Sequence, residues 1–337
     1  MEINISKTNE LTLRPIRDSD LVEVVDLMNA ADRALVGHNI LTVEEFKSDI
    51  SMPDFDPITD TRVVLTSTGN IAGYADYWAG PDPHVRIYGF VRIHPEHKGE
   101  GVGPTVTDWL EDRAVQDLQA APEGLRVTLG QRAYATQHNA RSFLECRGYN
   151  HARSSYRMTI KLDDSIPQPV WPEGFVVRSI DPATDDLRLA IQAEQEAFLD
   201  HYGVMPEPFE TYYERRKHFL MSESNVDFSA CYMVLDGDQV AAVEFNSVSV
   251  ADDLNTAWIG TLGVRRQWRK NGLGLALLRM AFTEMCKRGK NRVGLYVDAE
   301  NLTGALRLYQ NAGMFVEYEN CYYEKELRPG KDLANKG

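Results

Sequence analysis

The chain has 337 residues, of which 43% are hydrophobic and 26% are charged, and its formal net charge is −14 at pH 7. This length favours two domains, and the composition is typical of a soluble globular protein. The negative charge argues against a nucleic-acid partner, because phosphate binding needs a basic face, and it is more compatible with a small or cationic partner.

The cysteine and histidine spacing gives no sign of a metal site. Cys146, Cys231, Cys286 and Cys321 form no Cys-x-x-Cys pair, and no histidine cluster has metal-ligand spacing. We expect reduced thiols, no metal and a cytoplasmic protein. The first twenty residues are charged throughout, and no apolar run approaches the roughly 18 residues of a membrane span. Neither a signal peptide nor a membrane segment is therefore expected.

Strand and helix signals follow a fixed order in the first half. Residues 11–31 predict a strand ending in arginine, a polar turn and an amphipathic helix, and 67–78 predict a glycine turn with an alternating strand. Residues 94–107, HPEHKGEGVGPTVT, place glycines directly before a helical pattern. Residues 143–149 then end a helix at a glycine, and 154–162 predict a closing strand.

The second half repeats this order after residues 163–173, a stretch rich in proline and aspartate that we predict to be a linker. The corresponding segments are 175–198 for 11–31, 235–246 for 67–78, 308–314 for 143–149 and 320–327 for 154–162. Whole domains are repeated, not short units. The sequence therefore predicts an α+β fold of two tandem domains, 1–162 and 174–337, each a mixed twisted sheet with helices on both faces.

The glycine turn of the second half indicates an anion site. It follows a predicted buried strand, WIGTLGV (258–264), and opens a predicted helix, LGLALLRMAFTEMCKR (273–288). A helix N-terminus offers unpaired backbone N–H groups and the positive end of the helix dipole, so it can bind phosphate. Gly272 and Gly274 carry no side chain that would keep an anion away, and Arg269 adds a positive charge.

The same turn resembles motif A of a known family. Arg269-x-x-Gly272-x-Gly274 stands between a strand and a helix, and LYVDAENLTGALRLYQNAGM (295–314) follows it with a strand, an asparagine and a short helix bearing a tyrosine. In this order and spacing they resemble motifs A and B of the GNAT (Gcn5-related N-acetyltransferase) family. The wording of the second motif is most similar to mycothiol synthase and its tandem GNAT relatives, which are also built from two such domains.

The resemblance implies acetyl-CoA as the donor and an amine as the acceptor. The pyrophosphate would lie on backbone amides of the turn, and the pantetheine arm would pair with the end of the preceding strand. Tyr309 corresponds to the family's general acid, which protonates the leaving thiolate, although a core aromatic is the simpler structural interpretation. The cofactor-binding residues expected on this basis are Leu262, Gly263, Val264, Arg269, Lys270, Asn271, Gly272, Leu273, Gly274, Leu275 and Asn301.

The general base is less well marked. In mycothiol synthase a glutamate lies on the strand before motif A, and the corresponding position here is Trp258. This departure leaves both the base and the mycothiol precursor as substrate open. Glu244, on the neighbouring predicted strand, is the candidate we favour, against the alternative of a solvent-facing carboxylate; Asp298 and Glu300 are weaker candidates.

Acceptor contacts are expected in the segment 198–219, where GNAT proteins commonly form a loop and helix over the acceptor. Asp200, His201 and Tyr202 are the predicted substrate-binding residues, and Glu207 adds to the acidic character. Such a segment suits a cationic amine, and His201 could relay protons. A solvated amphipathic helix accounts for the segment equally well.

Five positions of the first half depart from the working pattern. Lys98 replaces the usual arginine or glutamine, Glu100 adds a negative charge, and Pro104 removes an amide as the helix opens. Leu144 stands where the second half has Tyr309. Thr136 stands where it has Asn301, so we expect the first domain to be non-catalytic.

The sequence as a whole predicts an acetyl-CoA-dependent N-acetyltransferase. It would act on the primary amine of a small molecule by direct transfer, with Tyr309 as general acid, in a monomer or homodimer without nucleic-acid or membrane partners. Two alternatives stay open: a non-catalytic protein that binds or senses acyl-CoA, and an acyltransferase that uses another acyl-CoA.

Overall fold

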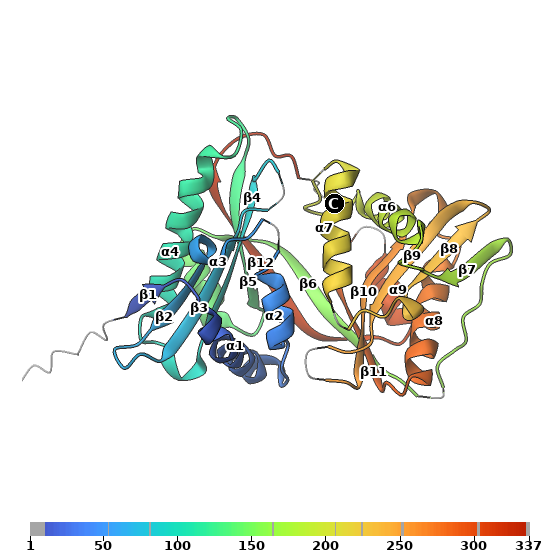
Figure 1. Ribbon diagram of the computed structural model, residues 1–337, viewed down its shortest axis with the longest axis horizontal. Coiled ribbons are helices and arrows are strands. Elements are labelled where there is room, and N and C mark those ends of the chain that lie inside the picture. Colours follow the sequence, from blue (N-terminus) through green and yellow to red (C-terminus); the bar gives the residue numbers. More distant parts are fainter. Residues whose placement is uncertain are drawn as a thin grey trace, which may run out of the picture. The chain divides into compact units, whose positions relative to one another are not determined.

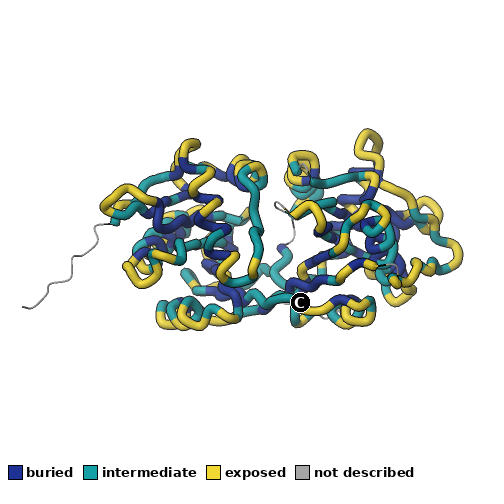
Figure 2. Tube along the Cα trace, turned by 90° about the horizontal axis from the view of Figure 1, so that it is seen from below, coloured by how far each residue is buried: buried dark blue, intermediate teal, exposed yellow. Residues whose placement is uncertain are grey.

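The computed structural model describes residues 11–334 except 53, 81, 164, 206, 224, 251–252 and 302–303. Its contacts divide the chain into two compact units, drawn in Figure 1 with colours that follow the sequence. Unit 1 comprises residues 1–132, 138–150 and 323–332, and unit 2 comprises 133–137, 151–322 and 333–337. In Figure 2, both units have buried segments of their own, with exposed residues mainly at turns and helix surfaces.

Unit 1 has a mixed sheet in the strand order β1-β2-β3-β4-β5, followed by the end of β12. Neighbouring strands are antiparallel from β1 to β4, and β4 and β5 are parallel. Its helices and strands are β1 (Thr12–Arg14), α1 (Leu21–Val36), α2 (Val43–Asp49), α3 (Pro57–Asp60), β2 (Thr61–Leu65), β3 (Ile71–Trp78), β4 (Arg86–Ile93), α4 (Val102–Gln116), β5 (Val127–Tyr134) and α5 (His138–Cys146).

Unit 2 repeats this arrangement in the order β6-β11-β10-β9-β8-β7, with the first part of β12 next to β6. Here β10 and β11 are the parallel pair. Its helices and strands are β6 (Asn150–Lys161), β7 (Phe175–Ser179), α6 (Asp186–Phe198), α7 (Phe209–Ser222), β8 (Tyr232–Asp236), β9 (Gln239–Ser247), β10 (Thr256–Val264), α8 (Leu273–Lys287), β11 (Arg292–Asp298), α9 (Ala305–Asn311) and β12 (Phe315–Arg328).

Helices cover both faces of each sheet because successive strand residues point to opposite faces. In unit 2, Val243 and Phe245 of β9 pack with α6 and α7, whereas Ala242 packs with Leu273 and Leu277 of α8. In unit 1, α1 and α2 share one core cluster and α4 another. The predicted α+β fold with helices on both faces is thereby confirmed.

The two halves of the sequence exchange strands. Strand β6 ends the first half of the chain, yet it lies in unit 2, antiparallel to β11 from Lys161↔Arg292 to Ser155↔Asp298. The last part of β12, from Tyr323, lies in unit 1, where Glu324 forms a buried ion pair with Arg86 at 2.9 Å. The compact units therefore differ from the predicted ranges 1–162 and 174–337 by this exchange.

Candidate active site

The site of unit 2 begins where two parallel strands separate. Pairing between β10 and β11 covers Thr256–Trp258 on the β10 side and ends there. One residue later the register of β10 against β9 shifts between Ile259 and Thr261, so Gly260 is an extra residue, as in a β-bulge. A cavity of about 870 Å³ opens beyond this point, with residues of both strands in its wall. From Leu262 to Val264, β10 still pairs with β9 on one edge, whereas its other edge is past the pairing with β11 and these residues line the cavity.

The glycine turn closes one end of this cavity. Gly272 is the N-cap of α8 with φ 85°, and Lys270 before it has φ 68°. Such positive φ values favour residues without a Cβ, and glycine at position 272 meets this requirement. The first N–H groups of α8, at Leu273, Gly274 and Leu275, have no carbonyl acceptor within the helix, and all three residues line the cavity. A Cβ at Gly274 would lie 3.2 Å from Leu308.

Arg269 lines the cavity, but its guanidinium is occupied by protein groups. Its Nε donates to the Val264 carbonyl at 3.1 Å and its Nη2 to the Ala197 carbonyl at 2.8 Å. Both Nη atoms also bond the Asp200 carboxylate, and this pairing lowers the pKa of Asp200. Arg269 and Asp200 thus fasten the end of α6 to the strand before the turn. The geometry favours the backbone amides over the Arg269 side chain as the phosphate ligands.

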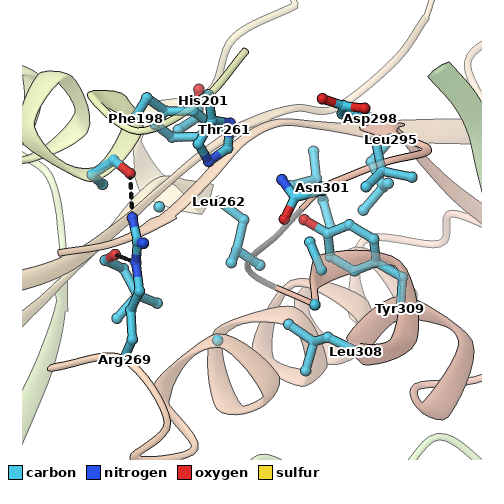
Figure 3. A pocket seen from close by; sticks show the side chains of 18 of the residues that line it. Phe198, His201, Thr261, Leu262, Arg269, Leu295, Asp298, Asn301, Leu308 and Tyr309 are labelled. Carbon is cyan, nitrogen blue, oxygen red and sulfur yellow. Dashed lines mark hydrogen bonds between the residues drawn. The ribbon is translucent and has the colours of Figure 1, made fainter. Parts of the chain in front are cut away.

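Tyr309 presents its hydroxyl to the cavity from α9. Figure 3 shows the phenol pointing toward Asn301, on the segment that precedes the helix. The side chain is only 7% exposed, and burial raises its pKa well above the ordinary value. Because the phenol stays protonated at neutral pH, it can donate a hydrogen bond or a proton to a group in the cavity.

Glu244 lies on the sheet face that α8 covers, opposite Leu262 in the register of β9 and β10. It is 0% exposed and is not among the cavity-lining residues. One carboxylate oxygen accepts from Asn246 at 3.3 Å, and Oε1 is buried without a hydrogen-bond partner in the part of the chain that the structure describes. Burial raises its pKa well above the ordinary value. A neutral, enclosed carboxyl group is poorly suited to accept a proton from an amine in the cavity.

His201 and Tyr202 line the cavity, as does Asp200. The His201 ring contacts Phe198 with ring centroids 4.5 Å apart, and burial lowers its pKa below 6.5. The imidazole is therefore neutral at neutral pH and has a nitrogen lone pair available. His201 thus lies in the cavity wall with a nitrogen that can accept a proton, whereas Glu244 does not line the cavity.

A buried ion pair fixes the cavity wall at the bulge. The Thr261 hydroxyl donates to Glu194 Oε1 at 2.7 Å and accepts from Arg216 Nη2 at 3.0 Å. Arg216 Nε also bonds the other Glu194 oxygen at 2.9 Å. The sequence analysis did not single out these three residues, because Glu194 and Arg216 lie on α6 and α7 within ordinary amphipathic patterns.

Arg153 is a further cavity residue that the sequence analysis missed. It belongs to β6, and its Nε bonds both Asp298 carboxylate oxygens, at 2.9 and 3.0 Å. Its guanidinium also lies 4.6 Å above the Tyr202 ring. Arg153 therefore ties β6 to the end of β11 and to the loop after α6. No local sequence signal marks it, because the exchange of β6 into unit 2 is not visible in hydrophobic periodicity.

The predicted cofactor residues come together around one cavity. All of them except Asn271 line it, although they come from β10, the glycine turn, α8 and the segment before α9. Trp258, at the position of the expected glutamate, lies under the Arg157 guanidinium at 4.7 Å, and a Cβ at Gly294 would be 2.5 Å from its ring. Trp258 is therefore a packing residue of the sheet.

Unit 1 has the glycine turn without the bulge. Gly101 caps α4 with φ 87°, as Gly272 caps α8. However, the β3–β4 register runs without a break from Gly73↔Ile93 to Trp78↔Tyr88. Leu144 is 4% exposed and offers no proton at the position corresponding to Tyr309. These features are consistent with the prediction that this half is non-catalytic.

Two further classes of feature are missing from the described residues. Within the ranges that the structure describes, no group of three or more His, Cys, Asp or Glu side chains could hold a metal ion. The helices in these ranges are too short or too polar to cross a membrane.

Comparison with known proteins identifies relatives of both halves. The model of the Acetyltransferase (GNAT) family matches residues 27–152 and again 190–314. Mycothiol acetyltransferase of Streptomyces scabiei is 28% identical over 78% of this chain and 79% of its own length, and that of Salinispora arenicola is 30% identical over 74% and 76%.

Two solved structures extend the similarity along the chain. A GCN5-related N-acetyltransferase from Sphaerobacter thermophilus has a TM-score of 0.79 and 30% identity, covering 96% of this chain and 98% of that one. A tandem GNAT protein from the clavulanic acid biosynthesis pathway has a TM-score of 0.72 at 16% identity, covering 96% and 100%, and supports the fold alone.

Proposed function

Because the chain belongs to the GNAT family and is an N-acetyltransferase, we propose that unit 2 transfers the acetyl group of acetyl-CoA to the primary amine of a small molecule. One observation carries this proposal. A single cavity runs along the separated strands β10 and β11, from the open N-terminus of α8 to the hydroxyl of Tyr309. A phosphate site, a free strand edge and a proton donor are thus combined in one wall.

The residues present fit acetyl-CoA. Its phosphates would be held by the N–H groups of Leu273, Gly274 and Leu275, where the helix dipole also favours negative charge. The amide-bearing arm would pair with the edge of β10 at Leu262–Val264. The positive φ at Gly272 and the close approach of Leu308 to Gly274 support the need for glycine at both positions. The group supplies an activated acyl carbon at its thioester.

Two side chains of unit 2 would move protons in the transfer. The amine nitrogen forms a bond to the acyl carbon while the carbon–sulfur bond breaks. We assign to His201 the proton that the amine loses, since its imidazole is neutral and lines the cavity. Tyr309 gives its hydroxyl proton to the departing sulfur. In this assignment His201 replaces Glu244 as the base, because the carboxyl group of Glu244 is enclosed and its pKa is raised.

The acceptor is a small-molecule amine in this proposal. The curated relatives carry the name mycothiol acetyltransferase. Trp258 is a packing residue at the position where the resemblance to these relatives leads one to expect a glutamate, so β10 does not carry that carboxylate. The exact amine is therefore a matter for a substrate panel.

The test compares two matched glycine variants. Release of free thiol from acetyl-CoA is followed for a panel of primary amines, with the wild type, Gly272→Asp and Gly101→Asp. Both positions are helix N-caps with nearly the same positive φ, so backbone strain is matched. Gly272→Asp places a carboxylate beside the amides of α8 and should nearly abolish turnover.

Gly101→Asp should leave most of the turnover. Equal loss in the two variants, with both proteins folded, would place catalysis in unit 1 or remove the α8 turn as the phosphate site. If no amine in the panel releases thiol above the rate of water, the proposed transfer is wrong.

A further inference from the structure

A second, smaller cavity opens beside the first. It has a volume of about 210 Å³ and shares Phe198, Gly260 and Thr261 with the main cavity. The shared residues include the bulge of β10, where the strand edge turns from pairing with β11 to lining the cavity. A molecule whose amine lies in the main cavity near the bulge can therefore extend its other end into this side cavity.

Most of the side-cavity wall is apolar. Leu199, Val204 and Met205 of the loop after α6 form one side, and Phe198 and Tyr212 contribute aromatic rings. Since one water occupies roughly 30 Å³ in the liquid, the volume corresponds to about seven such molecules or a short hydrocarbon arm. Such a lining favours a slender, flexible arm over a polyhydroxylated ring.

Glu207 has a buried oxygen that no described residue bonds. Glu207 lines the side cavity, and its side chain is only 11% exposed. Its Oε1 accepts from Arg215, whose side chain is 44% exposed. Its Oε2 is buried and has no hydrogen-bond partner among the residues that the structure describes. An enclosed carboxylate oxygen without a donor is unfavourable, and a cationic donor satisfies it best.

The other carboxylate of the wall already accepts hydrogen bonds from protein groups. Glu194 receives hydrogen bonds on both oxygens, from Thr261 and from Arg216. Arg215 bonds Glu207 through Oε1, so the inner oxygen, Oε2, receives no hydrogen bond from it. Glu207 thus carries an unsatisfied carboxylate oxygen beside this wall; Oε2 is closed to solvent, so a ligand in the cavity reaches it only when the Glu207 side chain turns toward the ligand.

We propose that the side cavity binds the far end of the acceptor and that Glu207 selects amines carrying a second cationic nitrogen on a short apolar arm, as in an α,ω-diamine. This inference rests on the proposed acetyl transfer in the main cavity and names the acceptor class of that site. One nitrogen of the diamine lies at the bulge and takes the acetyl group, and the other donates to the Glu207 carboxylate.

The experiment measures kcat/KM in the full-length protein for three acceptors of matched length. These are 1,4-diaminobutane, 4-amino-1-butanol and butylamine. The diamine should exceed butylamine by at least about tenfold, with the amino alcohol between them. Glu207→Gln keeps the size of the side chain and removes its charge, so it should reduce the ratio of diamine to butylamine toward one.

Glu210→Gln is the matched control. Glu210 lies in the first turn of α7, just after Glu207; it is exposed, pairs with Arg188 and is not in either cavity wall. This variant should keep the wild-type ratio. The thermal midpoint of each variant shows that it is folded. An equal ratio in Glu207→Gln and wild type, or a preference for the amino alcohol over the diamine, would overturn the inference.

Calorimetry with CoA present separates this inference from the proposed function. If 1,4-diaminobutane binds in a Glu207-dependent manner but no acetyl group is transferred, the proposed transfer fails, and only the binding of the second cationic nitrogen at Glu207 stands. If acetyl transfer proceeds without any preference among the three acceptors, the transfer stands and the inference fails. Loss of both binding and transfer overturns both.

Discussion

Tyr309 and Leu144 occupy corresponding places in the two halves, and burial alone does not distinguish them. Their exposed fractions are 7% and 4%. What separates them is the surrounding wall: the Tyr309 hydroxyl points into a cavity and toward Asn301, whereas Leu144 belongs to a unit without the bulge. The difference supports the proposal that Tyr309 is a proton donor, whereas Leu144 has no proton to donate.

Tyr309→Phe keeps the ring and removes the hydroxyl proton. If this proton reaches the leaving sulfur in the transition state, kcat should fall on the order of 10²-fold, within the usual range for a general acid. The affinity for acetyl-CoA and the thermal midpoint should change little, because ground-state binding does not use the proton. Steady-state kinetics and calorimetry on the same variant measure both effects.

A purely structural hydroxyl predicts the reverse pattern for this variant. Unfolding free energy would then drop by about 1 kcal/mol, as for one lost hydrogen bond, and the rate would be retained. A wild-type kcat in Tyr309→Phe would remove Tyr309 from the mechanism.

The assignment of His201 as the base predicts how kcat/KM changes with pH on the acidic side. Burial lowers its pKa below 6.5, so the imidazole is neutral at pH 7 and becomes protonated only under more acidic conditions. As a base it should make kcat/KM fall about tenfold per pH unit below that lowered pKa. His201→Gln should lower the rate and remove this acidic limb. Profiles should be measured with an acceptor of known pKa, since the amine's own protonation adds a separate slope.

The lowered pKa of His201 also makes the free energy of unfolding depend on pH in one direction. The unfolded state takes up the proton first as the pH falls, because its histidine pKa is higher than that of the folded state. The contribution of His201 to the free energy of unfolding is therefore complete above pH 6.5 and declines below it.

For the kinetic prediction, an acidic limb of kcat/KM that persists unchanged in His201→Gln would assign the base to another group.

At the scale of elements, local pattern predicted much of the fold. The predicted helix 273–288 and strand 258–264 correspond to α8 at Leu273–Lys287 and β10 at Thr256–Val264. Apolar periodicity and turn glycines specify such elements from within one segment. The bulge at Gly260 could not be predicted, since it depends on the register of β10 against β9.

Contacts between residues that are distant in the sequence could not be predicted either. Arg269 was predicted as a phosphate ligand, yet its guanidinium meets Asp200 and the Ala197 carbonyl on another element. Arg153 meets Asp298 across the β6–β11 pair. The residue type predicts that each arginine will bond a carboxylate or another acceptor, but the tertiary packing determines which acceptor lies within reach.

At the scale of the whole molecule, the exchange of strands makes each unit depend on both halves of the sequence. Unit 2 receives β6, whose Arg157 bonds Glu317 at 2.7 Å and whose Arg153 lies in the cavity wall. Unit 1 receives the end of β12, where Arg86 pairs with Glu324. The site of unit 2 thus depends on β6, which comes from the first half of the sequence, although we expect the glycine turn of the first half to be non-catalytic.

This dependence predicts that the second half does not function alone. A fragment of residues 174–337 lacks β6, so β11 loses its antiparallel partner over seven residues, from Arg292 to Asp298. The edge of β11 would then be exposed. Met158 and Leu162, which pack in the same core cluster as α8, would also be missing. We expect no cooperative unfolding transition and no acetyl-CoA binding by calorimetry. A fragment that begins at residue 150 restores β6 with Arg153 and should recover binding, although the end of β12 remains without its partners in unit 1. Wild-type affinity in the 174–337 fragment would show that β6 is dispensable for the site.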